Sequence, residues 1–370
     1  MNLPLTPLRY KRRAAQLFGR KQGVVCGENR FTYQEFDQRC DRFSAALLQL
    51  GVRPGDRVSF LSPNCHRLLE AYYAVPQIGA ILLPLNVRLT AAELIQILHD
   101  AAPRLLFFDT EFDGEAKKMT HADLPIEDFI CLDHPRPSGW SGKTYEELLE
   151  SSLPRAFDWT TLDENSVAEL FYTSGTTALP KGVMLTHRSL YLHALYVAHA
   201  RKMSDADAEA YTIPLFHVNS WGAPHTLTLS GARHVILRKF NPPTLLSLIE
   251  QERITRLQMV PSMAIALINH PGIEQCDLAS VKEVMIGGAP ANQALMRQLE
   301  ERFPGAVVAG GYGLTETSPV VSIAYLKEHL KNEPHDEQLR RTSTAGYAIT
   351  GVEVRLAALD GSEVPADGST

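Results

Sequence analysis

Residues 57–108 determine the fold class, and their sequence is RVSFLSPNCHRLLEAYYAVPQIGAILLPLNVRLTAAELIQILHDAAPRLLFF. Three short apolar runs have the length and composition of buried strands: Arg57–Leu61, Ala80–Leu85 and Arg104–Phe108. The intervening pattern predicts a helix over Asn64–Gln77 and a second one, capped by Thr90 with Glu93, that ends near Asp100. Strands separated by helices pair in parallel through right-handed crossovers, so we expect a sheet covered by helices.

The same alternation returns after a less regular stretch, Asp109–Asn165, which we expect to form loops and one short helix at Tyr145–Ser151. Further strands are predicted at Val167–Tyr172, Gly182–Leu185, Ala210–Ile213, His234–Leu237, Arg256–Val260, Glu283–Ile286 and Val307–Ala309. Helices fit between them at His187–Lys202, Pro242–Arg253, Ser262–His270 and Ala291–Phe303. These units are too many for one sheet, so we expect an α/β fold with two doubly wound, mainly parallel sheets.

The last part of the sequence has a different character. Residues 327–341 are highly charged and predict a surface segment, and Val352–Ala357, Asp360-Gly361 and Glu363–Val364 predict a hairpin. We therefore expect a large domain over 1–340, with two intermixed subdomains near 50–170 and 171–325. Residues 341–370 would then begin a small β-rich, barrel-like subdomain.

Composition excludes several classes of protein. Lys and Arg number 36 and Asp and Glu 42, a net charge of −6 that does not favour nucleic-acid binding. The longest apolar run, Tyr72–Leu85, contains two prolines and is too short to predict a membrane span. The five cysteines are widely spaced with no CxxC pattern, which predicts reduced thiols in a cytoplasmic protein.

The most informative motif is FYTSGTTALPKG at residues 171–182. Hydroxyl groups and free backbone N–H groups bind a phosphate chain, and Lys181 adds a compact positive charge. A polar turn between strands would explain TSGT alone, but the whole run is more specific. It is not a Walker A loop, because Gly182 follows the lysine where that motif needs Ser or Thr.

Three further segments stand out, and by itself only the first indicates a nucleotide site. In GGYGLTETSP, at 310–319, Tyr312 can stack on a base, Thr315 can bond a phosphate and Glu316 can hold Mg²⁺. The segment GGAP at 287–290 is by itself an ordinary connection between a strand and a helix. In IPLFHVNSWG, at 213–222, a lone histidine and a tryptophan at a helix start are more often core residues than site residues.

Together these segments resemble the adenylate-forming superfamily of acyl-CoA synthetases, peptide-synthetase adenylation domains and luciferase, over Phe31 to Gly368. The sequence departs from the loop pattern once, with Ala178 in place of the usual Gly. The resemblance implies that ATP or AMP is bound by Thr173, Ser174, Gly175, Thr176, Thr177, Lys181, Gly288, Ala289, Pro290, Gly311, Tyr312, Gly313 and Thr315. It also implies catalytic roles for Lys181, His217, Thr315 and Glu316, the last as the Mg²⁺ ligand.

The pattern FHVNxW is similar to bacterial medium- and long-chain fatty acyl-CoA synthetases, in which a Trp closes the mouth of a fatty-acid tunnel until ATP binds. It implies an acyl pocket formed by His217, Trp221, Gly287 and Gly288. We therefore expect ATP-dependent activation of a fatty acid to its adenylate, followed by thioester formation with coenzyme A. A ligase for an aryl or short sulfur-containing acid, and a non-catalytic nucleotide- or acyl-binding module, are the alternatives.

In that superfamily the chain continues into a ribose-binding Asp, a hinge and a small lid domain with a catalytic Lys. We expect residues 1–370 to lack this C-terminal lid and to be poorly active or inactive alone. The implied partners are a carboxylic acid, ATP and CoA, without nucleic acid or a membrane span. A homodimer is left open.

Overall fold

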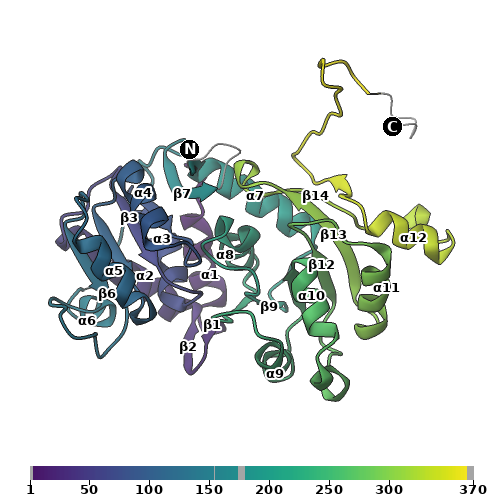
Figure 1. Cartoon of the computed structure of the whole chain (residues 1–370), viewed down its shortest axis with the longest axis horizontal. Helices are drawn as coiled ribbons and strands as arrows, with labels where there is room; N and C mark the ends of the chain where they lie inside the picture. The colour runs from purple at the N-terminus through teal and green to yellow at the C-terminus, as the bar shows by residue number, and fades with distance from the viewer. Residues whose placement is uncertain (1–2, 154, 174–179, 365–370) are drawn as a thin grey trace.

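The computed structural model describes residues 3–153, 155–173 and 180–364, which form two sheets with helices on their faces (Figure 1). The first sheet has six strands in the order β6-β5-β3-β4-β7-β8, and all its pairings are parallel except the hairpin of β7 and β8. Its strands are β3 (Arg57–Leu61), β4 (Ile81–Pro84), β5 (Leu105–Phe108), β6 (Asp128–Cys131), β7 (Val167–Thr173) and β8 (Lys181–Thr186).

Alternating side chains of the six-stranded sheet face two separate cores. Phe107 packs with Phe60 against α2 (Tyr33–Gln49) and α3 (His66–Gln77). The next residue, Phe108, points to the opposite face, which is covered by α4 (Ala91–Ala101) and α5 (Asp113–Thr120). All four residues of β5 are buried, as expected for a parallel strand covered on both faces.

The second sheet has nine strands in the order β15-β14-β13-β12-β11-β9-β10-β1-β2. Six strands from β13 to β1 are parallel, while β2, β14 and β15 are antiparallel at the edges. Its strands are β1 (Gln22–Cys26), β2 (Asn29–Thr32), β9 (Ala208–Ala210), β10 (Arg233–Val235), β11 (Arg256–Met259), β12 (Glu283–Ile286), β13 (Val307–Gly313), β14 (Val320–Ile323) and β15 (Tyr347–Ala348).

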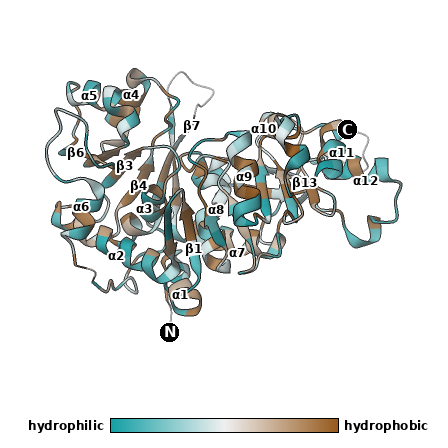
Figure 2. Cartoon of the chain, turned by 90° about the horizontal axis from the view of Figure 1, so that it is seen from below, coloured by the Kyte–Doolittle hydropathy of each residue, from teal (hydrophilic) through white to brown (hydrophobic). Residues whose placement is uncertain are grey.

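Helices join the two sheets through one continuous core. Apolar residues of α1 (Leu8–Phe18), α7 (His187–Ala200) and α8 (Val218–Ser230) pack in a cluster that contains residues of both sheets. The other face of the nine-stranded sheet is covered by α9 (Pro242–Glu252), α10 (Pro261–Ile268), α11 (Gln293–Arg302) and α12 (His335–Thr342). Figure 2 shows hydrophobic strands enclosed by helices with hydrophilic outer sides.

The predicted fold class is confirmed, and several elements have the predicted bounds, including β3 and β12. The cap at Thr90 is also present, because its backbone N–H donates to Glu93 Oε2 at 2.8 Å. The predicted hairpin near the end is reduced to a single antiparallel bridge between Ala357 and Glu363. Within the described residues, no helix is both long and apolar enough to cross a membrane.

The prediction of loops with one helix over 109–165 is wrong. The structure has α6 (Tyr145–Glu150) as expected, but also α5 and β6. Only Ala116 and Met119 of α5 are buried, so the helix has almost no apolar periodicity to recognise. Strand β9 is also displaced from the predicted 210–213, because the apolar residues continue past the strand into loop. The division into domains and subdomains stays a prediction.

Candidate functional site

A cavity of about 510 Å³ lies at the carboxyl ends of strands from both sheets. Its walls come from the end of β7, the start of β8, the turn at the start of α8, and the ends of β12 and β13 with the segments that follow them. Ligands in open α/β folds bind at the carboxyl ends of strands. The lining residues are Thr173, Lys181, His217, Val218, Trp221, Met285, Gly287, Gly288, Gly311, Tyr312, Gly313, Leu314, Thr315, Glu316, Pro319 and Val320.

Most of the site residues predicted from the sequence meet in this cavity, although their segments are far apart in the chain. Ala289 and Pro290 are not among its lining residues, and both are exposed in the loop before α11. Ser174, Gly175, Thr176 and Thr177, together with Ala178, lie outside the described residues. The lining residues that were not predicted are Val218, Met285, Leu314, Pro319 and Val320. Val218, Leu314 and Pro319 belong to the quoted motifs, whereas Met285 and Val320 lie just outside them.

The hairpin of β7 and β8 holds both ends of the predicted phosphate loop at the cavity. Thr173 ends β7, Lys181 begins β8, and the two are directly paired across the antiparallel ladder. The short turn η3 (Thr315–Thr317) lies beside β8. Glu316 on this turn is exposed and lines the same cavity as Lys181. A cationic and an anionic side chain, from two neighbouring elements, therefore line the same cavity.

Two glycines that line the cavity lie against Trp221. A Cβ atom at Gly287 would lie 3.0 Å from Cη2 of the Trp221 ring. At Gly288, which has φ +74°, a Cβ would lie 3.1 Å from Cγ1 of Val260 and 3.4 Å from the same ring. Glycine is needed at Gly288 both for its backbone angle and for this close approach.

Trp221 lies in a left-handed turn and not at the start of a regular helix. Val218, Asn219, Ser220 and Trp221 have φ values of 36°, 44°, 50° and 56°, and Gly222 follows with 85°. Left-handed backbone costs non-glycine residues roughly 1–2 kcal/mol each. Such strain persists only where the surroundings hold it, and it is concentrated at functional sites.

Two histidines near the turn differ in their exposure. His217 faces the cavity, and partial burial by the cavity walls, with a smaller effect of Arg88, lowers its pKa below the ordinary value. His193 is buried, and burial lowers its pKa from 6.5 to about 3. Its neutral Nε2 accepts a hydrogen bond of 3.0 Å from the backbone N–H of Val320, a cavity residue. His193 thus fixes one wall of the cavity in its uncharged form.

Comparison with known proteins places this arrangement in a family. The model of the AMP-binding enzyme family matches residues 11–370. The chain belongs to the AMP-binding enzyme family. It is 36% identical over 366 residues, 97% of this chain, to a long-chain-fatty-acid–CoA ligase of Thermus thermophilus. It is 30% identical over 384 residues, 100% of this chain, to a peroxisomal benzoate–CoA ligase of Arabidopsis thaliana.

The chain of this AMP-binding enzyme spans 66% of the length of each of these two relatives. Among solved structures it is similar to a long-chain-fatty-acid–CoA ligase from Archaeoglobus fulgidus. The TM-score is 0.85 at 25% identity, and the match covers 98% of this chain and 73% of the other. This likeness agrees with the two-sheet fold found here.

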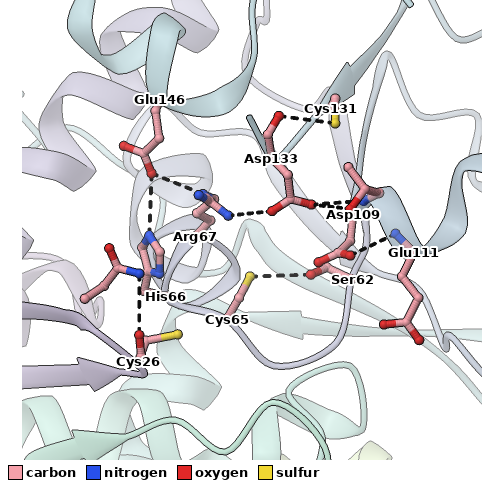
Figure 3. Close-up of polar contacts among 12 residues, drawn as sticks. Cys26, Ser62, Cys65, His66, Arg67, Asp109, Glu111, Cys131, Asp133 and Glu146 are labelled. Atoms are coloured by element: carbon pink, nitrogen blue, oxygen red, sulfur yellow. Dashed lines mark hydrogen bonds and ion pairs between the residues drawn. The ribbon is translucent and has the colours of Figure 1, made fainter. Parts of the chain in front are cut away.

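A cluster of charged side chains lies at the carboxyl ends of β3, β5 and β6, and ion pairs join its members; Figure 3 shows those around Arg67. Arg67 lies between two carboxylates and donates to Glu146 Oε1 and Asp133 Oδ1, at 3.1 Å each. From the end of the other sheet, Arg238 donates to Asp109 Oδ1 at 2.7 Å. These ion pairs lie at the carboxyl ends of the strands, which is where open α/β sheets bind ligands.

Neighbouring donors and cations lower the pKa of Glu146, a carboxylate of this charged cluster. Burial alone would raise its pKa, but hydrogen bonds from His66 and Arg39 and the charge of Arg67 hold that pKa well below its usual range. In the part of the chain that the structure describes, no group of three or more His, Cys, Asp or Glu is placed to bind a metal.

Proposed function

We propose that this AMP-binding enzyme activates a carboxylic acid, foremost a fatty acid, as its adenylate and then transfers the acyl group to coenzyme A. The carboxylate oxygen attacks the α-phosphorus of ATP, and pyrophosphate leaves. The CoA sulfur then attacks the acyl carbon, the thiol proton is lost, and AMP leaves. The observation that carries the proposal is one cavity lined by Lys181, Thr315 and Glu316 together with His217 and Trp221.

The polar lining residues of the cavity provide the groups that adenylate formation needs. Lys181 would neutralise the departing pyrophosphate, and the Thr315 hydroxyl would donate to the α-phosphate. Glu316 would hold Mg²⁺, which spreads the charge of the phosphate oxygens when it is bound. Tyr312, with 47% of its surface exposed, offers a ring face to adenine.

Further nucleotide contacts are proposed for the backbone and hydroxyl groups around these polar residues. They involve Thr173, Ser174, Gly175, Thr176, Thr177, Gly288, Ala289, Pro290, Gly311 and Gly313. Of these, Gly311 is followed along β13 by Tyr312, so its peptide lies close to the proposed adenine position.

The apolar lining residues around Trp221 would bind the acid. Trp221 and the two glycines Gly287 and Gly288 leave a slot beside the ring, and Val218, Met285 and Val320 add apolar surface. His217, with its lowered pKa, would be neutral at pH 7 and able to donate or accept a hydrogen bond at the acyl carboxylate. The Thermus relative, by its name, favours a long-chain fatty acid. The Arabidopsis relative, by its name, keeps an aryl acid as the second candidate.

The setting of the proposed enzyme is the cytoplasm. All five cysteines are free thiols, in agreement with a reducing compartment. We also propose that 341–370 begins a small β-rich subdomain after a large domain over 1–340.

The test is mass-spectrometric detection of acyl-AMP and acyl-CoA made by the full-length protein from ATP, Mg²⁺ and a panel of acids. The panel contains octanoate, palmitate, benzoate and 3-methylmercaptopropionate. We expect adenylate with at least one acid, with loss of the product in Lys181→Ala. Nucleotide binding without adenylate from any acid would contradict the proposal and favour a binding module.

A further inference from the structure

Asn219 is the central polar residue of the left-handed turn that carries Trp221. Its side chain is fully buried. Its Oδ1 accepts a hydrogen bond of 2.7 Å from the backbone N–H of Gly222, which closes the turn. Its Nδ2 donates at 2.7 Å to Oε2 of Glu169. The amide thus links the inside of the turn to a carboxylate on another element.

Glu169 is a fully buried acid in the middle of β7. Its second oxygen, Oε1, lies 2.7 Å from Nε2 of His225 on α8. The same strand ends at Thr173, the cavity residue at which the predicted phosphate loop begins. One carboxylate therefore contacts both the strained turn and the helix behind it, from the strand that leads into the cavity.

A carboxylate suits this place better than any neutral side chain of the same size. Two donors, one in the left-handed turn and one in the regular part of α8, approach its two oxygens, and an ionised carboxylate only accepts. Buried polar groups without partners are costly, so Asn219 would leave its place if Glu169 were removed. The turn has an unfavourable backbone conformation that its surroundings must hold. Loss of this contact would release it.

We propose that Glu169 is a positioning residue that holds the turn 218–222, and thereby places His217 and Trp221 at the acid. It touches neither substrate. The inference rests on the proposed function for its kinetic consequences, whereas the position of Trp221 is independent of that function.

The first experiment compares Glu169→Ala and Asn219→Ala with Glu70→Ala in the full-length protein. Glu70 is the matched control because it is also fully buried and bonded, to Arg39 and Tyr145, but it does not contact the turn. We expect kcat/KM for the acid to fall about 10–100-fold in the two test variants, since small misplacements near a reacting group have such effects. The KM for ATP should change less than about 3-fold. Glu70→Ala should lower stability without this selective effect on the acid.

Fluorescence gives a readout that a purely structural role would not move. The part of the emission that Trp221→Phe removes should shift in Glu169→Ala and Asn219→Ala, and stay unchanged in Glu70→Ala. Glu169→Gln keeps an acceptor for Asn219 and should restore part of the acid kcat/KM. It also serves as the test variant if the alanine variant does not fold.

A double-mutant cycle then distinguishes a positioning role of Glu169 from a role as a core residue only. The effects of Glu169→Ala and Asn219→Ala on Trp221 emission should not add in the double variant, because both break one contact. Unchanged Trp221 emission and equal losses for acid and ATP would show that Glu169 is only a core residue. If the wild-type protein forms no adenylate, the proposed function fails, and the emission cycle still decides whether Glu169 positions the turn.

Discussion

The carboxyl ends of the two sheets have similar topology but different contents. At the six-stranded sheet, charged side chains after β3, β5 and β6 pair with one another and with Arg238 from the other sheet. At the nine-stranded sheet, β12 is followed by Gly287-Gly288 and β13 contains Gly310-Gly311. In open α/β folds the carboxyl ends of parallel strands are where ligands bind, so by topology both places are candidate sites. The residues at and after the end of each strand decide whether that place is filled by ion pairs or left open to a ligand.

The largest expected effect is on the open side, at Glu316. Glu316→Gln keeps the shape but removes the charge proposed to hold Mg²⁺, so adenylate formation should slow about 10²–10³-fold, as when one transition-state stabiliser is lost. The measurement is pyrophosphate release by the full-length protein against Mg²⁺ concentration. An unchanged Mg²⁺ dependence would remove Glu316 from the metal site.

The closed side should respond in stability and not in activity. Arg67→Ala leaves Asp133 and Glu146 without a shared donor, which should lower the free energy of unfolding by about 1.5–3 kcal/mol, as for hydrogen bonds to charged groups. Urea unfolding measures it, and Arg136→Ala, at an exposed pair with Glu147, is the control with an expected loss below about 1 kcal/mol. A large loss of adenylate formation with unchanged stability would show that the charged cluster around Arg67 also binds a substrate.

The comparison can be sharpened at a single glycine. Gly288→Ala places a Cβ against Val260 and Trp221 at φ +74°, so the KM for the acid should rise roughly 10-fold, equal to about 1.4 kcal/mol. Gly305→Ala is the control, because that residue also has positive φ, +87°, but an added Cβ would meet nothing within 4 Å. Equal KM values in the two variants would mean that the Trp221 slot does not hold the acid.

The smallest effect concerns His193 and pH. The pKa of His193 is about 3 in the folded protein against 6.5 as the ordinary value, so the unfolded chain binds more protons as pH falls below about 6.5. Between pH 7.5 and 5.5 this one group should lower the stability by about 1.4 kcal/mol. His193→Gln, which keeps an acceptor for Val320, should lose less stability over this interval by that amount in urea unfolding. An identical pH dependence would show that the pKa of His193 is the same in the folded and the unfolded protein.

Much of the fold could be predicted because its signals are local. The apolar run of β3 and the Thr90 cap are contained in a few neighbouring residues. The cavity could be predicted in part, because motifs carry Lys181, Tyr312 and Glu316 as recognisable units. That they line one cavity required the folded structure.

The rest depends on contacts between distant residues. Asn219 bonds to Glu169 across 50 residues, and Arg238 bonds to Asp109 across 129 residues, and neither pair has a local pattern. The left-handed turn could not be predicted either, because Asn-Ser-Trp beside a helix has no glycine before Gly222 to indicate positive φ.

The central claim is that the adenylate binds in the cavity lined by Lys181, Trp221 and Glu316, and not at the charged cluster around Arg67. The most direct measurement is a crystal structure of the full-length protein with a non-hydrolysable acyl-sulfamoyl adenosine. The account predicts adenine on the Tyr312 ring, the sulfamoyl group at Thr315, and the acyl chain beside Trp221. Density for the compound between Arg67 and Asp109, with an empty cavity at Glu316, would contradict it.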